Sequence, residues 1–599
     1  MGTLLAACGA PKQQAAEPTP PADLVLMNGD IYTGDPVQPR VQALAIRSGH
    51  IVAIGSNDEI RHINTQRTID LGGRLVIPGI NDAHVHEPAL EEHLGAALGA
   101  RVGAKVTDAA LDKSAGSASE PAGQATAQGA MVDLPGEFDT LTVPDMLASI
   151  ERATHEQPAG TWLHAVLSRA ALDDPTLTRE GLDRVAPAHP VWIDNFAGHA
   201  LVFNSAAERA AGIDASAPVP RGAFVGRDGK GGHDGWRYEY ARYAALRAFG
   251  AKVSDADVNA AIRDFEARAG EFGITTVQAL PLQVDDARLE TALRASQRTL
   301  RWHVMRVPVG EIIAPPYMLA LVDQGLAGSP ELEGMVTVYG TKYWLDGTPI
   351  ERGAALREPY ADAPTDGRPP AGRADFDPAA IREMLVRARA SGDPLHLHIA
   401  GDVQLQALLA AMEELRPKKP GSVGDWPEQR VVIEHGDGIA AADIARIRAL
   451  GIVVVQNPSH MTTPELMRAR LGDRVARWMP MKSLVTSGVP FALGSDGPLN
   501  PFLNIKLATE HPANPDEALT REQALVAYTQ GAAYDERTEQ FKGKLITGYA
   551  ADLAVLSQDI FTVPADALPH TRSVMTIVGG TIVLDRLSPA SAPTSERTE

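Results

Sequence analysis

The sequence predicts an α/β protein: a (β/α)8 barrel of the TIM type, with a small β-sandwich domain formed from both termini and an inserted cap subdomain. Two observations support this prediction. Apolar, strand-like runs alternate with amphipathic helical stretches through the middle of the chain, which favours a parallel sheet. Short strands separated by turn residues occur at both ends of the chain, which is typical of a small all-β unit.

Eight apolar runs are predicted as barrel strands, the number that a (β/α)8 barrel requires. The amphipathic segments Pro378–Ala390 and Ala440–Leu450 are predicted as helices between them. The eight runs are Leu75–His86, Ile274–Leu280, Trp302–Val307, Val336–Asp346, Leu395–Ile399, Val431–His435, Ile452–Gln456 and Phe491–Asp496.

The remaining segments are assigned around this barrel. The gap after the first barrel strand is too long for one βα connection, so it is predicted to hold a low-complexity insert and a cap with strands at Trp162–Leu167 and Val191–Phe196. The alternative to a sandwich built from both termini is two unrelated edge hairpins. The predicted units are residues 1–22 (tether), 23–74 and 545–590 (β-sandwich), 75–98 and 270–544 (barrel), 99–135 (insert) and 136–269 (cap).

Composition excludes several classes of protein. The 44% of hydrophobic and 22% of charged residues are typical of a globular chain rather than a disordered one. A net charge of -20 argues against binding to nucleic acid, because phosphate contacts need clustered Lys and Arg. The single cysteine excludes an internal disulfide framework and any zinc site built from several thiolates.

That cysteine lies at the start of the chain. Leu5-Ala6-Ala7-Cys8 resembles the lipobox of bacterial lipoproteins, in which the cysteine becomes lipidated, and the polar stretch after it resembles a flexible tether. The basic segment that precedes a lipobox is missing and the apolar segment is short, so either the true start lies upstream or the match is a chance one. The resemblance predicts membrane attachment through Cys8 in the cell envelope, periplasmic or membrane-anchored; the alternative location is cytoplasmic.

The strongest local motif lies at the end of the first predicted barrel strand. His84 and His86 are two residues apart, so on a strand both side chains point to the same face. At the carboxyl end of a barrel strand that face is the catalytic mouth. Two neutral imidazoles there form half of a zinc site, whereas the alternative is a pair of surface histidines.

Four further residues on or at the ends of predicted strands have metal chemistry. His398, His435 and Asp496 each end a strand, and Lys342 interrupts an apolar one. A buried lysine is costly unless its charge is paired or removed. Carboxylation by CO₂ would turn Lys342 into an anionic oxygen ligand, whereas the alternative is a lysine that faces outward. Taken together in barrel order, these residues predict a metal site.

These motifs together resemble the amidohydrolase superfamily, in particular its YtcJ-like branch, amidohydrolase family 3. The resemblance extends from Asp23 to about Leu584, except for the insert. It is carried by Pro78-Gly79 with Asn81-Asp82-Ala83-His84-Val85-His86, Gly273-Ile274-Thr275-Thr276-Val277, Lys342 with Asp346-Gly347-Thr348, His398-Ile399-Ala400-Gly401-Asp402, Ile433-Glu434-His435, Gly494-Ser495-Asp496 and Gly548-Tyr549-Ala550-Ala551-Asp552-Leu553.

The resemblance implies roles for particular residues. One or two divalent metal ions, usually zinc, would be bound by His84, His86, His398, His435 and Asp496, with Lys342 carboxylated to bridge two metals. Asp496 would also be the general base. His199 in the cap would face the substrate, although Ala197 stands where the family more often has an acidic residue; the alternative is a structural histidine. His460 would contact substrate or cap its loop.

The implied function is hydrolysis of a C–N bond in a small N-acyl amide, formamide or cyclic amide by attack of a metal-bound hydroxide. One alternative is a deaminase that acts on an aminated ring with the same barrel. The other is a non-catalytic, metal-binding surface lipoprotein. The presence of Asp496 argues against it, because a binding protein does not need a general base. The sequence leaves the substrate, the number of metal ions and the oligomeric state open.

Overall fold

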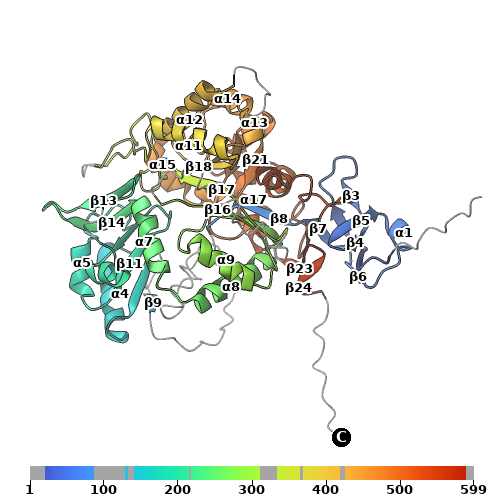
Figure 1. Ribbon diagram of the computed structural model, residues 1–599, viewed down its shortest axis with the longest axis horizontal. Helices are drawn as coiled ribbons and strands as arrows, with labels where there is room; N and C mark the ends of the chain where they lie inside the picture. The colour runs from blue at the N-terminus through green and yellow to red at the C-terminus, as the bar shows by residue number, and fades with distance from the viewer. Residues whose placement is uncertain are drawn as a thin grey trace, which may run out of the picture.

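Eight parallel strands form the central sheet of the computed structural model, which describes residues 20–86, 129–131, 140–214, 218–309, 334–364, 368–417 and 425–587. The strands follow one another around the sheet in chain order (Figure 1). They are β8 (Ile80–Val85), β15 (Ile274–Ala279), β16 (Arg301–Arg306), β17 (Val336–Trp344), β18 (Leu395–Ile399), β19 (Val432–His435), β20 (Val453–Gln456) and β21 (Phe491–Leu493).

The first and last strands of this sheet meet. Val85 and Asp496 form a parallel bridge, and the backbone N–H of Asp496 donates to the carbonyl of His84 at 2.8 Å. The sheet is therefore closed into a barrel, and the predicted fold class is confirmed. Seven of the eight strands lie within the segments predicted as barrel strands, and β16 begins at Arg301, one residue before its predicted segment.

The segment Leu75–His86 is not one barrel strand, and here the prediction was wrong. It is divided between β7 (Leu75–Pro78), which belongs to another sheet, and β8 of the barrel. The break falls at Gly79, where a Cβ would lie 2.1 Å from Thr275 Oγ1. Only glycine lets the backbone pass this close to β15, so the chain changes sheets at that residue.

Strands from both ends of the chain share the sheet that contains β7. It has the order β24-β23-β22-β7-β2-β3 and packs with a second sheet of order β5-β4-β1-β6 through residues such as Leu26, Val76 and Leu553. The alternative of two unrelated hairpins is thus excluded. The strands are β1 (Leu24–Met27), β2 (Asp30–Tyr32), β3 (Arg40–Val41), β4 (Ala43–Arg47), β5 (His50–Gly55), β6 (Thr68–Asp70), β22 (Leu553–Leu556), β23 (Ser573–Val578) and β24 (Thr581–Asp585).

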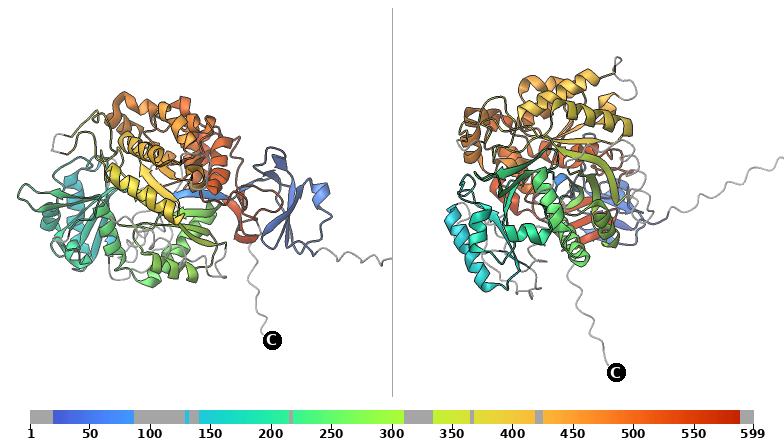
Figure 2. Two further views of the ribbon diagram at one scale, coloured as in Figure 1. Left: turned by 45° about the horizontal axis from the view of Figure 1, so that its top comes forward. Right: turned by 60° about the vertical axis from the view of Figure 1, so that its left-hand side comes forward.

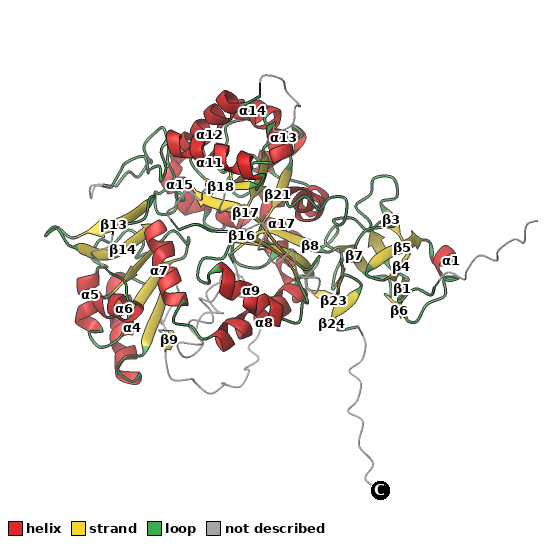
Figure 3. Cartoon of the chain, viewed as in Figure 1, coloured by secondary structure: helices red, strands yellow, loops and turns green. Residues whose placement is uncertain are grey.

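A separate six-stranded sheet, of order β13-β14-β12-β11-β10-β9, is inserted between β8 and β15. It lies at the end of the molecule opposite the terminal strands, with helices packed on it (Figures 2 and 3). Its elements are β9 (Gly129–Met131), β10 (Trp162–Leu167), β11 (Val191–Asn195), β12 (Ala200–Phe203), β13 (Ala223–Arg227), β14 (His233–Glu239), α4 (Val143–Glu156), α5 (Arg179–Val185), α6 (Ser205–Ala211) and α7 (Tyr240–Gly250).

Helices cover the outside of the barrel. The segment predicted at Pro378–Ala390 is α11 (Pro378–Ser391). It begins after Asp377, whose side chain accepts from the Ala380 N–H, and it is followed by Gly392 in the left-handed conformation. The other helices are α8 (Asp255–Glu271), α9 (Asp286–Ala295), α12 (Asp402–Leu415), α13 (Trp426–Gln429), α14 (Ile444–Ala449), α15 (Pro464–Leu471), α16 (Met481–Thr486), α17 (Pro501–Glu510), α18 (Arg521–Val526) and α19 (Ala532–Asp535). The short α1 (Asn57–Ile60) packs instead on the terminal strands β1, β4 and β5.

Two predictions fall on parts of the chain that the structure does not describe. Cys8 and most of the predicted tether lie outside the described residues, so lipid attachment stays a prediction. The predicted insert, 99–135, is described only at 129–131, and there the predicted boundary was wrong, because these residues form β9 beside β10 of the inserted sheet. Among the described helices, none combines the length and the apolar character needed to cross a membrane.

A buried ion pair connects the barrel to the terminal strands. Arg301, at the start of β16, donates from Nε to Asp552 Oδ2 at 2.7 Å and from Nη2 to Oδ1 at 3.1 Å. Asp552 also accepts the backbone N–H of Gly579 at 2.6 Å. Both charged side chains are less than a tenth exposed. The contact between the barrel and the terminal strands therefore depends on the presence of both charged partners.

Replacing Asp552 by Ala is therefore expected to destabilise the folded protein strongly. It leaves the Arg301 guanidinium buried without its carboxylate, which costs about 3–5 kcal/mol of unfolding free energy. Denaturant titration measures the loss. Glu271→Ala is the control, because its pair with Arg586 is exposed and is worth about 1 kcal/mol or less. Equal losses for the two variants would contradict this account.

Candidate metal centre

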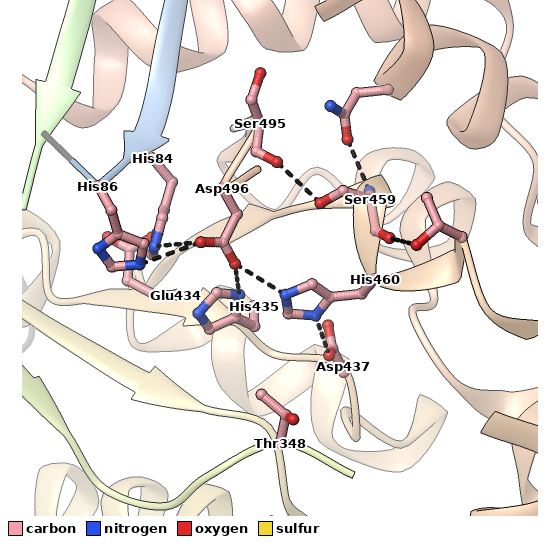
Figure 4. A network of polar contacts seen from close by, with 12 residues as sticks. His84, His86, Thr348, Glu434, His435, Asp437, Ser459, His460, Ser495 and Asp496 are labelled. Carbon is pink, nitrogen blue, oxygen red and sulfur yellow. Dashed lines mark hydrogen bonds and ion pairs between the residues drawn. The ribbon is translucent and has the colours of Figure 1, made fainter. Parts of the chain in front are cut away.

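Side chains from the carboxyl ends of four barrel strands converge at one mouth of the barrel. Figure 4 shows those of His84, His86, His435 and Asp496. The ring centroids of His84 and His86 are 5.2 Å apart, those of His84 and His435 4.8 Å, and those of His435 and His398 4.3 Å. Asp496 lies against the same group. The structure thus brings together the four histidines and the aspartate that the sequence singles out.

The ring nitrogens of these histidines are largely unpaired. Nε2 of His84, both nitrogens of His398 and Nδ1 of His435 are buried without a hydrogen-bond partner. Burial, with the nearby Lys342 charge, lowers the pKa of His84 to about 4, and burial also holds the pKa values of His398 and His435 well below the usual range. Neutral imidazoles with unsatisfied nitrogens are the donors that a divalent metal requires.

Asp496 supplies an anionic oxygen to the same space. Its Oδ1 lies 3.2 Å from His86 Nε2 and 3.6 Å from His84 Nε2, and its Oδ2 lies 3.9 Å from His435 Nδ1. Burial would raise the pKa of this carboxyl, but the neighbouring histidines hold it well below its ordinary value. Asp496 also has a left-handed φ of +57°, a strained conformation of the kind that gathers at functional sites.

Lys342 points into the barrel interior from β17. Its side chain is fully buried, and its Nζ has no hydrogen-bond partner. Burial lowers the pKa of the ammonium to about 8, although the carboxylates of Glu434 and Asp496 oppose that shift. The alternative of an outward-facing lysine is excluded. An amine with a lowered pKa is partly neutral near physiological pH, which is the form that reacts with CO₂.

Glu434 is a site residue that the sequence reasoning did not identify. Its two carboxylate oxygens accept from Nδ1 of His84 at 2.7 Å and from Nδ1 of His396 at 2.9 Å. With Nδ1 bound in this way, His84 turns its Nε2 towards the other histidines. The available signal was an acidic residue directly before His435 in an otherwise apolar strand.

His460 lies in the 3-10 turn Pro458–Met461 that follows β20. Its Nδ1 is 2.8 Å from Asp437 Oδ2, its Nε2 is 3.0 Å from Asp496 Oδ2, and its ring stacks on His435 at 4.7 Å. Burial lowers the pKa of His460, but Asp437 and Asp496 outweigh it and raise the value to about 10. Both ring nitrogens are engaged by carboxylates, so neither is open to a substrate.

His199 enters the same region from the inserted six-stranded sheet. It directly precedes β12, and its ring centroid lies 4.7 Å from that of His398. Its Nδ1 is hydrogen-bonded to Glu239 Oε2 at 2.9 Å, and one oxygen of Glu351 completes a group of three donor atoms within 4.8 Å of one another. The cap segment therefore contributes a side chain to the barrel mouth. The sequence reasoning identified His199 but not its neighbours Glu239 and Glu351.

A closed (β/α)8 barrel with histidines, an aspartate and a buried lysine at its mouth belongs to the class of metal-dependent barrel hydrolases. The sequence model of the Amidohydrolase family matches residues 67–584. The chain therefore belongs to the amidohydrolase family, as its motifs indicate.

Individual relatives are distant but collinear with this chain. YtcJ of Bacillus subtilis (strain 168) is 26% identical over 93% of this chain and 98% of its own length. The N-substituted formamide deformylase of Arthrobacter pascens is 24% identical over 94% and 98%, respectively. An uncharacterized metal-dependent hydrolase from Pyrococcus horikoshii OT3 superposes with a TM-score of 0.64 at 19% identity, over 90% of this chain and 99% of its own, which supports the fold.

The role of Glu434 gives a prediction about metal affinity. In Glu434→Gln the amide keeps the size of the side chain but loses the charge that orients His84. We expect the affinity for Zn²⁺ to fall by about 10–100-fold, the usual cost of losing such a partner. Competition with a chelator measures it, and Glu413→Gln, on the exposed pair with Arg446, is the control. Unchanged affinity in Glu434→Gln would contradict the assigned role.

Proposed function

We propose that this protein hydrolyses a C–N bond in a small amide-type molecule (an N-acyl amide, a formamide or a cyclic amide) with one or two bound divalent metal ions, most simply Zn²⁺. The observation that carries the proposal is the set of buried, unpaired histidine nitrogens around the ionised Asp496. The relative named as an N-substituted formamide deformylase supports the choice of bond.

The donor set fits such an ion. His84, His86, His398, His435 and Asp496 would hold it, and a carboxylated Lys342 would supply a further anionic oxygen if two ions bind. When bound, a divalent metal lowers the pKa of water towards ~7 and polarises a carbonyl oxygen. Imidazole nitrogens and carboxylate oxygens are both ligand types that zinc takes.

The chain's own residues then move the proton. Asp496 accepts a proton from the attacking water while the water oxygen bonds to the carbonyl carbon. Asp496 then returns that proton to the leaving nitrogen as the C–N bond breaks. The low pKa of Asp496 keeps its carboxylate ionised, which is the form that can accept a proton. His460 anchors this carboxylate, and His199 faces the substrate from the cap side, next to His398.

A panel of substrates distinguishes this function from its alternatives. Release of an amine or a carboxylate from amides and formamides supports the proposal. Release of ammonia from aminated rings, with no turnover of amides, would favour a deaminase. Bound metal with no turnover on either set would favour a binding protein.

The general-base role of Asp496 is tested by Asp496→Asn. The amide cannot accept the proton, so turnover is expected to fall by at least ~10²-fold, at the scale of general acid–base catalysis. Metal content, measured by inductively coupled plasma mass spectrometry, should stay largely intact because the histidines remain. Asp566→Asn, at the exposed partner of Lys506, is the control. Full activity of Asp496→Asn would refute the role.

Metal removal is expected to affect stability as well as activity. Chelation leaves several buried imidazole nitrogens without any partner, so the midpoint of thermal unfolding should fall, because bound metal stabilises the folded state by mass action. Adding Zn²⁺ back should restore both the midpoint and the activity. A midpoint and an activity that do not respond to thorough chelation would contradict a metal centre at this site.

A further inference from the structure

The position of the Asp496 carboxylate is fixed from two sides. Its backbone N–H donates to the His84 carbonyl at 2.8 Å, which holds the main chain against β8. Its side chain is about a fifth exposed, so surrounding packing alone does not fix its rotamer. Oδ1 faces His84 and His86, whereas Oδ2 receives Nε2 of His460 at 3.0 Å.

His460 is itself held rigidly. Asp437, two residues beyond His435 and fully buried, binds the other ring nitrogen at 2.8 Å. The His460 ring also lies nearly parallel to that of His435, at an interplanar angle of 19°. Because the groups on both sides are carboxylates, the ring donates from both nitrogens and cannot turn without breaking a hydrogen bond.

The turn that carries His460 is tied to the chain next to Asp496. Ser459 Oγ donates to the carbonyl of Ser495 at 2.9 Å, and the Ser459 N–H donates to Asn504 Oδ1 on α17 at 2.7 Å (Figure 4). Two consecutive residues of the turn, Ser459 and His460, therefore contact two consecutive residues after β21, Ser495 and Asp496. These two contacts hold the His460 ring next to the Asp496 carboxylate.

We propose that His460, oriented by Asp437, is a positioning residue that fixes the Asp496 carboxylate for proton transfer and does not bind substrate. The proposal rests on the proposed function for its kinetic consequences. Its structural consequence, the conformation of Asp496, does not depend on which reaction is catalysed. A carboxylate free to rotate would present its acceptor oxygen to the reacting water for only part of the time.

Two substitutions at one position test the proposal. His460→Leu removes both hydrogen bonds, whereas the amide of His460→Gln can still donate to Asp496. We expect kcat to fall by about 10–100-fold in His460→Leu, the cost of a misplaced catalytic group, and by less in His460→Gln. KM and metal content should change little in either variant. Thr462→Ala is the control, because it removes one hydrogen bond of the same turn, to the Ser459 carbonyl, without touching Asp496.

Two kinetic outcomes would overturn the proposal. A raised KM with unchanged kcat would make His460 a substrate contact. Equal loss of kcat and of metal in both variants would make its role merely structural. Crystal structures of the variants provide a test that does not use activity. Asp496 should leave its wild-type rotamer in His460→Leu and keep it in His460→Gln; an unmoved Asp496 in His460→Leu would refute the proposal even if no amide is hydrolysed.

Discussion

The candidate site depends on the closure of the barrel between its first and last strands. The hydrogen bond from the Asp496 N–H to the His84 carbonyl, with the Val85–Asp496 bridge, is the contact that joins these strands. Residues 412 positions apart in the chain thereby become neighbours, and the carboxylate of Asp496 comes to lie beside the imidazoles of His84 and His86. The left-handed conformations of His435 and Asp496 occur at the same mouth. The barrel therefore holds strained residues where their side chains are needed, and the surrounding sheet stabilises them.

A second constraint is the desolvation of this mouth. Burial keeps His84, His398 and His435 neutral, and the same burial makes each unpaired nitrogen costly. Glu434 and Asp437 satisfy selected nitrogens, those of His84 and His460 that face away from the centre. Among the donors left over, one atom each of His84, His435 and Asp496 lie within 4.8 Å of one another. A cation shared among them is the simplest way in which the folded chain can satisfy these groups.

Much of this arrangement could be predicted from the sequence because it depends on local patterns. His84 and His86 follow the period-two rule of a strand, and His398 and His435 end apolar runs. The division of Leu75–His86 could not be predicted, because it depends on the approach of Thr275 to Gly79, from a strand nearly 200 residues away. The sequence did not identify Glu434 and Glu239 as site residues for the same reason: their partners, His84 and His199, come from distant parts of the chain. A lone carboxylate in a sequence carries no sign of the histidine that it will orient.

The central claim is that the converging nitrogens and the Asp496 carboxylate form one metal centre. The most direct measurement is anomalous diffraction at the zinc absorption edge from crystals grown with Zn²⁺. The account predicts an anomalous peak enclosed by His84, His86, His398, His435 and Asp496, with extra density on Lys342 Nζ if two ions are present. A protein that takes up no metal there, or a peak only at distant surface residues, would contradict it.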